Sequence, residues 1–76
     1  GRTPAQVLAQ ARTTPDGAAA LVRELQRVTE DAPGDLPAHT WLAQVYDALG
    51  ETAKRDETLR RLYRERPDLL GVTAEP

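Results

Sequence analysis

Apolar residues recur along this chain at the spacing of three and four that is typical of amphipathic helices. Four segments show this pattern, and we predict helices over residues 4–13, 18–31, 37–49 and 52–66. No stretch alternates between apolar and polar residues, and the chain has no Phe and no Ile, so we expect no strand. Helices joined by short connections run antiparallel to their neighbours. The pattern therefore predicts an all-α fold of two stacked antiparallel helical hairpins, followed by a short C-terminal tail.

Caps and breaking residues support these boundaries. Thr3 and Gln6 have the spacing of a capping box, and Pro4 suits the first turn of a helix. Asp16 stands where it can cap the second helix, and Gly50 is a natural residue to end the third helix. We expect the second helix to have the clearest apolar stripe, made of Ala18, Leu21, Val22, Leu25 and Val28. The corresponding set in the fourth helix is Ala53, Leu59, Leu62 and Tyr63.

The two halves of the chain align with each other at an offset of 34 residues. Leu-Ala-Gln occurs at residues 8–10 and again at residues 42–44, and the other aligned pairs are Leu25 with Leu59, Val28 with Leu62 and Pro33 with Pro67. A period of 34 residues built from two helices is typical of tetratricopeptide repeats. The second half resembles that family at its large, small, aromatic, turn and final positions, which are His39, Ala43, Tyr46, Gly50 and Pro67.

The resemblance implies a single domain over residues 1–76, with one repeat at 2–35, a second at 36–68 and a tail at 69–76. In such a repeat, the small Ala43 would let the third and fourth helices approach closely, and Tyr46 would fill the wedge between them. His39 would be partly packed in the core. The chain departs from the family at Arg55, where a small residue is expected, and at Arg12, where the first half lacks an aromatic residue.

In the family, the first helix of each repeat lines a concave groove that holds a segment of a partner protein. The resemblance therefore implies a partner-binding groove whose candidate residues are Gln6, Gln10, Pro37, Thr40, Trp41, Gln44 and Asp47. Trp41 has two interpretations that stay open: it anchors a partner, or it packs between the first and third helices. No Lys or Arg lines this predicted groove, which argues against a clamp for a peptide carboxylate.

The composition gives no set of residues for catalysis, a metal or a cofactor. The chain has one His, no Cys and no Ser, so it offers no nucleophile with a partner base and no cluster of metal ligands. The net charge of −2 gives no general reason to expect a nucleic acid or a membrane as partner. There is no signal peptide or spanning segment, which favours the cytoplasm without fixing the compartment. We interpret the chain as a piece of a longer protein, or as one released from a tag, that binds another protein or peptide.

The fourth predicted helix is basic, and its candidate patch consists of Arg60, Arg61, Arg64 and Arg66. Such a patch can bind an anionic partner, but pairs at a spacing of four, namely Asp56–Arg60, Glu57–Arg61 and Arg61–Glu65, can also neutralise it. This helix would also be under-covered at the end of two repeats, because a repeat array buries each unit on the next. A second hypothesis is therefore a structural or oligomerisation domain that associates with copies of itself.

Overall fold

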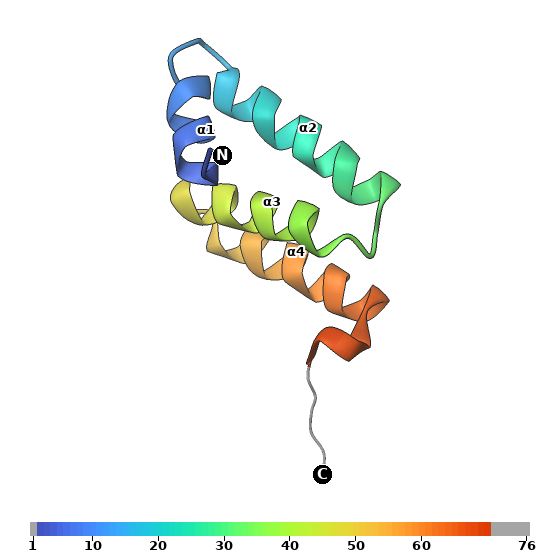
Figure 1. The fold of residues 1–76 in the computed structure, drawn as a ribbon. Helices are drawn as coiled ribbons and strands as arrows, with labels where there is room; N and C mark the ends of the chain where they lie inside the picture. The colour runs from blue at the N-terminus through green and yellow to red at the C-terminus, as the bar shows by residue number, and fades with distance from the viewer. Residues whose placement is uncertain (1, 71–76) are drawn as a thin grey trace.

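The computed structural model describes residues 2–70, and over this range the chain forms four α-helices, one short 3-10 helix and no strand (Figure 1). The helices are α1 (Pro4–Ala11), α2 (Gly17–Asp31), α3 (Leu36–Ala48) and α4 (Thr52–Glu65), and the 3-10 helix is η1 (Pro67–Leu70). The all-α prediction is confirmed, and each predicted helix exists with ends within two residues of those expected. Within the described residues, none of these helices has the length and apolar character needed to cross a bilayer.

Helix α3 lies at the centre of the fold. Figure 1 shows α2, α3 and α4 side by side in chain order, with neighbouring helices running in opposite directions. Helix α3 contacts α1, α2 and α4, whereas α4 contacts only α3 and η1. The most deeply buried apolar residues are therefore concentrated on α3, and the core consists of Leu8, Leu42, Ala43, Val45, Tyr46 and Leu62.

The turn between α1 and α2 differs from the prediction in two ways. Helix α1 ends at Ala11 rather than at Thr13, because the hydroxyls of Thr13 and Thr14 donate hydrogen bonds to the carbonyls of the last helical turn. Asp16 makes no capping hydrogen bond; it adopts a left-handed conformation with φ of 63°. A Cβ at Gly17 would overlap the carbonyl oxygen of Ala11, so this turn needs a glycine for close approach.

Two other predicted helix ends are confirmed. Thr3 and Gln6 form the capping box, with the Thr3 amide donating to Gln6 Oε1 at 2.9 Å and the Gln6 amide donating to Thr3 Oγ1 at 3.2 Å. Gly50 follows α3 with a positive φ of 78°, which a residue with a side chain rarely adopts. Helix α3 begins one residue earlier than predicted because Asp35 caps it by accepting a hydrogen bond from the amide of Ala38 at 3.2 Å.

The two hairpins are not equally tight. Leu8 and Leu42, which are equivalent in the internal repeat, are both 2% exposed. Ala9 is exposed, however, whereas its equivalent Ala43 is only 4% exposed. The contact between α3 and α4 is also more extensive than that between α1 and α2. The first hairpin is therefore more open than the second.

This difference changes which apolar residues are buried. Val28 of α2 is 41% exposed, whereas its repeat equivalent Leu62 of α4 is fully buried. Helix α2 is the most strongly amphipathic of the four helices, as predicted, but its apolar stripe is only half-buried or exposed. Its one buried residue is Thr29, whose hydroxyl donates to the Gln26 carbonyl at 2.8 Å. The expectation that the apolar side chains of α4 are incompletely buried is wrong for Leu62, which is fully buried. Leu59 and Tyr63 are half-buried.

Arg66 holds the end of α4 to the rest of the fold. Its guanidinium donates to the carbonyl of Gly34 at 3.0 Å and to the carboxylate of Asp68 at 3.0 and 3.1 Å. The hydrogen bond from Arg66 is the first cause that lowers the pKa of Asp68 below its usual value. Helix η1 contacts α4, its neighbour in the chain. Residues 71–76 of the predicted tail lie outside the described residues.

Candidate functional site

A groove of about 350 Å³ lies between α3 and α4. We call it the α3–α4 groove, and its lining residues are Thr40, Ala43, Gln44, Asp47, Arg55, Leu59 and Tyr63. Four of them come from α3 and three from α4, at the spacing of three and four that places residues on one side of a helix. Ala43, which is 4% exposed, is the small apolar residue of the α3 wall. The groove therefore combines an apolar part with polar groups from α3.

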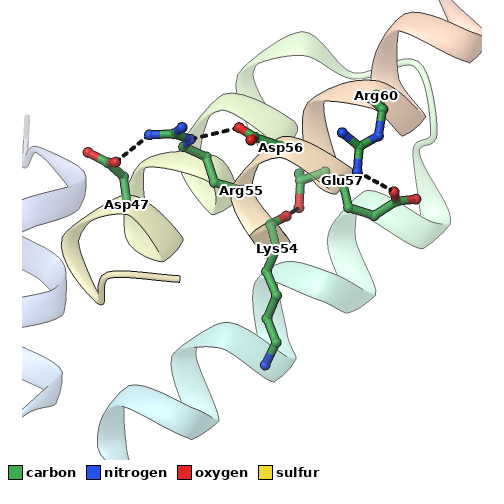
Figure 2. A network of polar contacts seen from close by, with 7 residues as sticks. Asp47, Lys54, Arg55, Asp56, Glu57 and Arg60 are labelled. Carbon is green, nitrogen blue, oxygen red and sulfur yellow. Dashed lines mark hydrogen bonds and ion pairs between the residues drawn. The ribbon is translucent and has the colours of Figure 1, made fainter. Parts of the chain in front are cut away.

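One end of the groove carries a compact cluster of charges, shown in Figure 2. The guanidinium of Arg55 on α4 donates to Asp47 Oδ1 of α3 at 2.6 Å and to Asp56 Oδ1 at 3.1 Å. The hydrogen bond to Asp56, followed by that to Asp47, raises the pKa of Arg55, so this side chain stays charged. Two carboxylates thus contact one guanidinium, and the formal charges of these three side chains sum to about −1 at neutral pH. Asp47 and Arg55 line the groove, whereas Asp56 does not.

Only three of the residues predicted from the sequence line this groove: Thr40, Gln44 and Asp47. Pro37 and Trp41 also lie on α3, but outside the lining, where Pro37 is exposed and Trp41 is half-buried. The remaining two candidates, Gln6 and Gln10, are exposed on α1 and do not line the groove.

The α4 side of the groove was not among the predicted site residues. Arg55, Leu59 and Tyr63 are spaced by four, so the sequence already indicates that they share one side of a helix. In the sequence pattern, Leu59 and Tyr63 belong to the apolar stripe of the fourth helix, and Arg55 stands where the tetratricopeptide pattern has a small residue. Helical spacing does not indicate the ion pair that Arg55 forms with Asp47 across the turn between α3 and α4.

A second cavity, of about 400 Å³, lies between α2 and the turn that joins α3 to α4. The Tyr46 side chain is 5% exposed and lines this cavity. Its hydroxyl accepts a hydrogen bond from Gln26 Nε2 of α2 at 2.7 Å. The Tyr46 hydroxyl thus reaches α2, a contact that the predicted role of Tyr46 between α3 and α4 did not include. Figure 2 shows Lys54, another residue of the lining, extending away from the charge cluster and toward α2.

The single histidine belongs to the core, as predicted. His39 is 3% exposed, and its Nδ1 lies 2.7 Å from the carbonyl oxygen of Asp35 one turn earlier. Because a carbonyl oxygen only accepts hydrogen bonds, Nδ1 is the protonated nitrogen in this contact. In the part of the chain that the structure describes, no three His, Cys, Asp or Glu residues gather as metal ligands would.

The candidate basic patch on α4 is divided by its contacts. Glu57 pairs with Arg60 at 3.1 Å and with Arg64 at 3.9 Å, and the Arg60 pair is visible in Figure 2. Among the described residues, the ion pairs predicted at a spacing of four do not form. Glu57 instead pairs with arginines three and seven positions later in the chain. Arg61 is exposed, whereas Arg66 is committed to Gly34 and Asp68. The four arginines therefore do not act as one free surface.

Comparison with family models, with curated proteins and with solved structures found no match to this chain. The resemblance to tetratricopeptide repeats therefore rests on the residues quoted above and stays a prediction. The structure is a small all-α fold of helical hairpins with a groove between α3 and α4. Two of the groove's lining residues, Asp47 and Arg55, form an ion pair, and Arg55 also pairs with Asp56.

Proposed function

We propose that this chain is a protein-interaction module that binds a segment of a partner protein in the α3–α4 groove. The observation that supports this proposal is the groove itself, where half-buried Leu59 and Tyr63 lie opposite polar groups of α3. Apolar anchors beside a few hydrogen-bonding groups are typical of a site that binds a peptide segment. Gln44 is exposed on the rim and can both donate and accept hydrogen bonds with a partner backbone.

Trp41 supports the same proposal from the neighbouring side of α3. It is half-buried, and it precedes Val45, which is fully buried, by one helical turn. Trp41 thus lies between the core and the exposed side of α3 that carries Gln44. It is the only tryptophan in the chain, so its fluorescence reports on events at this surface.

The test is a selection of peptides from a displayed random library against the whole chain, followed by affinity measurement with labelled peptides. Gln44→Arg places a bulky charge on the rim and is expected to weaken binding by about tenfold, a loss of about 1.4 kcal/mol. Its matched control is Gln10→Arg, the same change at the repeat-equivalent position on α1, which does not line the groove. Binding that changes for neither variant, or a library that yields no binder, contradicts the proposal.

The alternative of self-association is supported by a different observation. Val28 and Leu36 are the exposed large apolar residues of the described chain, each 41% exposed, and both lie near the turn that joins α2 to α3. Sedimentation of the chain over a wide range of concentrations tests this alternative. A constant monomer mass argues against it.

A further inference from the structure

The cavity between α2 and the turn that joins α3 to α4 lies apart from the site of the proposed function. It shares no lining residue with the α3–α4 groove, and its volume is about 400 Å³. Small-molecule sites have volumes of about 300–1,000 Å³, so this cavity has the size for a small ligand. Part of its lining is apolar and comes from Ala18, Val22 and Leu49, which are all half-buried. The cavity therefore has room for a small apolar group.

A buried hydroxyl gives this cavity a hydrogen-bond donor. Tyr46 is 5% exposed, and its hydroxyl accepts a hydrogen bond from Gln26 Nε2 at 2.7 Å. Both residues line the cavity. A tyrosine hydroxyl also carries one hydrogen of its own, and in the part of the chain that the structure describes this hydrogen has no acceptor. Because a buried donor without an acceptor is unfavourable, an acceptor on a ligand would stabilise this arrangement.

Two exposed cations belong to the same lining. Arg23 comes from α2 and Lys54 from α4, and Figure 2 shows the Lys54 side chain extending toward α2. Neither forms an ion pair with another described residue. The one carboxylate of the lining belongs to Glu51, so the formal charges of the lining sum to about +1 at neutral pH. A ligand with a single negative charge would balance this sum.

The beginnings of two helices supply further donors at this cavity. Helices α1 and α3 are capped by side chains, whereas the N-cap residues of α2 and α4, Asp16 and Glu51, make no side-chain hydrogen bond. The first turns of both helices contribute to the lining, through Ala18 and Ala19 of α2 and through Lys54 of α4. The amides of a first helical turn carry partial positive charge, which favours a nearby anion.

A carboxylate attached to a small apolar group matches these features. An ionised carboxylate only accepts hydrogen bonds, so it suits the Tyr46 hydroxyl, and its single charge equals the excess of positive charge in the lining. A phosphate monoester carries about −1.5 to −2 charges at neutral pH, and its excess charge would be repelled by Glu51. A neutral amide would leave the two cations without a counter-charge. The chemistry of the lining thus favours a monocarboxylate.

We infer that this cavity binds a small monocarboxylic acid with a short apolar chain. The carboxylate accepts the hydrogen of the Tyr46 hydroxyl and contacts Arg23 and Lys54, while the apolar chain lies against the half-buried residues of α2 and of the turn. This site differs from the peptide clamp that the sequence argues against, because its cations come from α2 and α4. The inference does not depend on a partner in the α3–α4 groove.

The test is a two-dimensional amide NMR titration of the whole labelled chain with isovalerate, repeated with the neutral isostere isovaleramide at matched ionic strength. The largest shift changes are expected at Ala18, Tyr46 and Lys54, with Gln44 and Leu59 of the α3–α4 groove unchanged. The acid is expected to bind at least about tenfold more tightly than the amide, since only the acid makes charge-assisted contacts. Equal affinities, or changes confined to the α3–α4 groove, overturn the inference.

Charge variants of the chain locate the anion. Arg23→Gln and Lys54→Gln are each expected to weaken isovalerate binding by about two- to fivefold, the range of a partly exposed ion pair. Arg27→Gln is the matched control, because Arg27 lies one turn later on α2, is exposed and does not line the cavity. It changes the net charge equally and is expected to leave the affinity unchanged. Equal weakening by Arg23→Gln and Arg27→Gln would show only a general attraction and overturns the site.

Two further variants test the remaining polar groups of the lining. Glu51→Gln is expected to tighten isovalerate binding by about twofold, because it removes a negative charge beside the anion. Tyr46→Phe is expected to weaken it by about three- to tenfold through loss of the donor, with circular dichroism used to check that the variant folds. The charge variants keep the test decisive if Tyr46→Phe does not fold, since they alter exposed side chains. Unchanged affinity in both variants overturns the assigned contacts.

Two other probes distinguish the small acid from ligands that share part of its chemistry. An acetylated tripeptide that ends in Leu with a free carboxylate presents the same group at the end of a chain. If this peptide binds more tightly than isovalerate, the end of a partner protein is the ligand and the small acid is overturned. Methyl phosphate that binds more tightly than isovalerate overturns the preference for a carboxylate. Weaker binding of both probes supports the inference.

Discussion

The difference between the two hairpins predicts unequal effects of truncating one pair of repeat-equivalent residues. Leu62→Ala and Val28→Ala change the same position of the 34-residue repeat, but Leu62 is fully buried and Val28 is 41% exposed. If the hairpins were equally tight, the two substitutions would cost similar free energies of unfolding per carbon removed. The structure predicts that they do not.

The magnitudes follow from the carbons removed. Leu62→Ala removes three buried carbons, or about 2.4 kcal/mol at about 0.8 kcal/mol each, and the cavity that remains brings the loss to about 2–5 kcal/mol. Val28→Ala removes two carbons from a side chain that is about three-fifths buried, so we expect a loss of about 1 kcal/mol. A chain of this length has a total stability of only about 4–11 kcal/mol. Because Leu62→Ala can remove most of this stability, the milder variant Leu62→Val is measured as well. It removes one carbon and is expected to cost about 1 kcal/mol.

The assay is urea unfolding followed by far-ultraviolet circular dichroism, with the free energy of unfolding extrapolated to water for each variant. The Leu62→Val variant stays measurable if Leu62→Ala unfolds the chain. A loss for Val28→Ala that equals or exceeds the loss for Leu62→Ala would refute the unequal burial of the two hairpins. A loss below about 1 kcal/mol for Leu62→Ala would show that α4 is not part of the core.

Three further perturbations test the local contacts that hold the helices in place. Gly17→Ala is expected to lower the free energy of unfolding by about 1–3 kcal/mol, because the added Cβ would overlap a backbone oxygen of α1. In the control, Gly34→Ala, the added Cβ meets only the Arg66 side chain at ordinary contact distance, so no loss is expected. Equal losses of stability in urea unfolding would contradict this prediction. Tyr46→Phe removes the hydrogen bond from α2 and is expected to cost about 0.5–1.5 kcal/mol, and an unchanged stability would show that this bond contributes nothing. Because the pKa of Asp68 is lowered in the folded chain, its pairing with Arg66 stabilises the fold at pH values above the ordinary pKa of 3.8. This contribution is lost as the pH falls through the lowered pKa. Carboxyl titration by NMR should show the Asp68 pKa rising toward its ordinary value in Arg66→Ala, and no rise would contradict the pairing.

Local features of the fold were predictable because they depend on neighbouring residues. The capping box of Thr3 and Gln6 and the left-handed Gly50 follow from short-range chemistry, and both are confirmed. The openness of the first hairpin was not predictable, since Ala9 and Ala43 occupy equivalent positions and share the same local pattern. Their burial differs because α1 is short and contacts its neighbours less extensively than α3 does.

In the candidate site, too, the part set by helical spacing was predictable, and the part set by the packing of two helices was not. Thr40, Gln44 and Asp47 share one side of α3, as helical spacing requires, and all three line the groove. The opposite wall depends on how closely α4 approaches α3 and on the contact between Arg55 and Asp47, eight residues apart across a turn. The identity of Arg55 suggested poor packing of α4. Its position at the end of the groove, paired with a carboxylate of α3, explains why a large cation is accommodated there.

The most direct test of where a partner binds is a two-dimensional amide NMR titration of the whole labelled chain with a peptide selected against it. Binding in the α3–α4 groove predicts that the largest shift changes fall on both of its walls, at Ala43, Gln44 and Leu59, while Gln10 and Ala9 on α1 stay unchanged. Changes centred on α1 and α2, with the groove residues unaffected, would contradict the claim that the partner binds between α3 and α4.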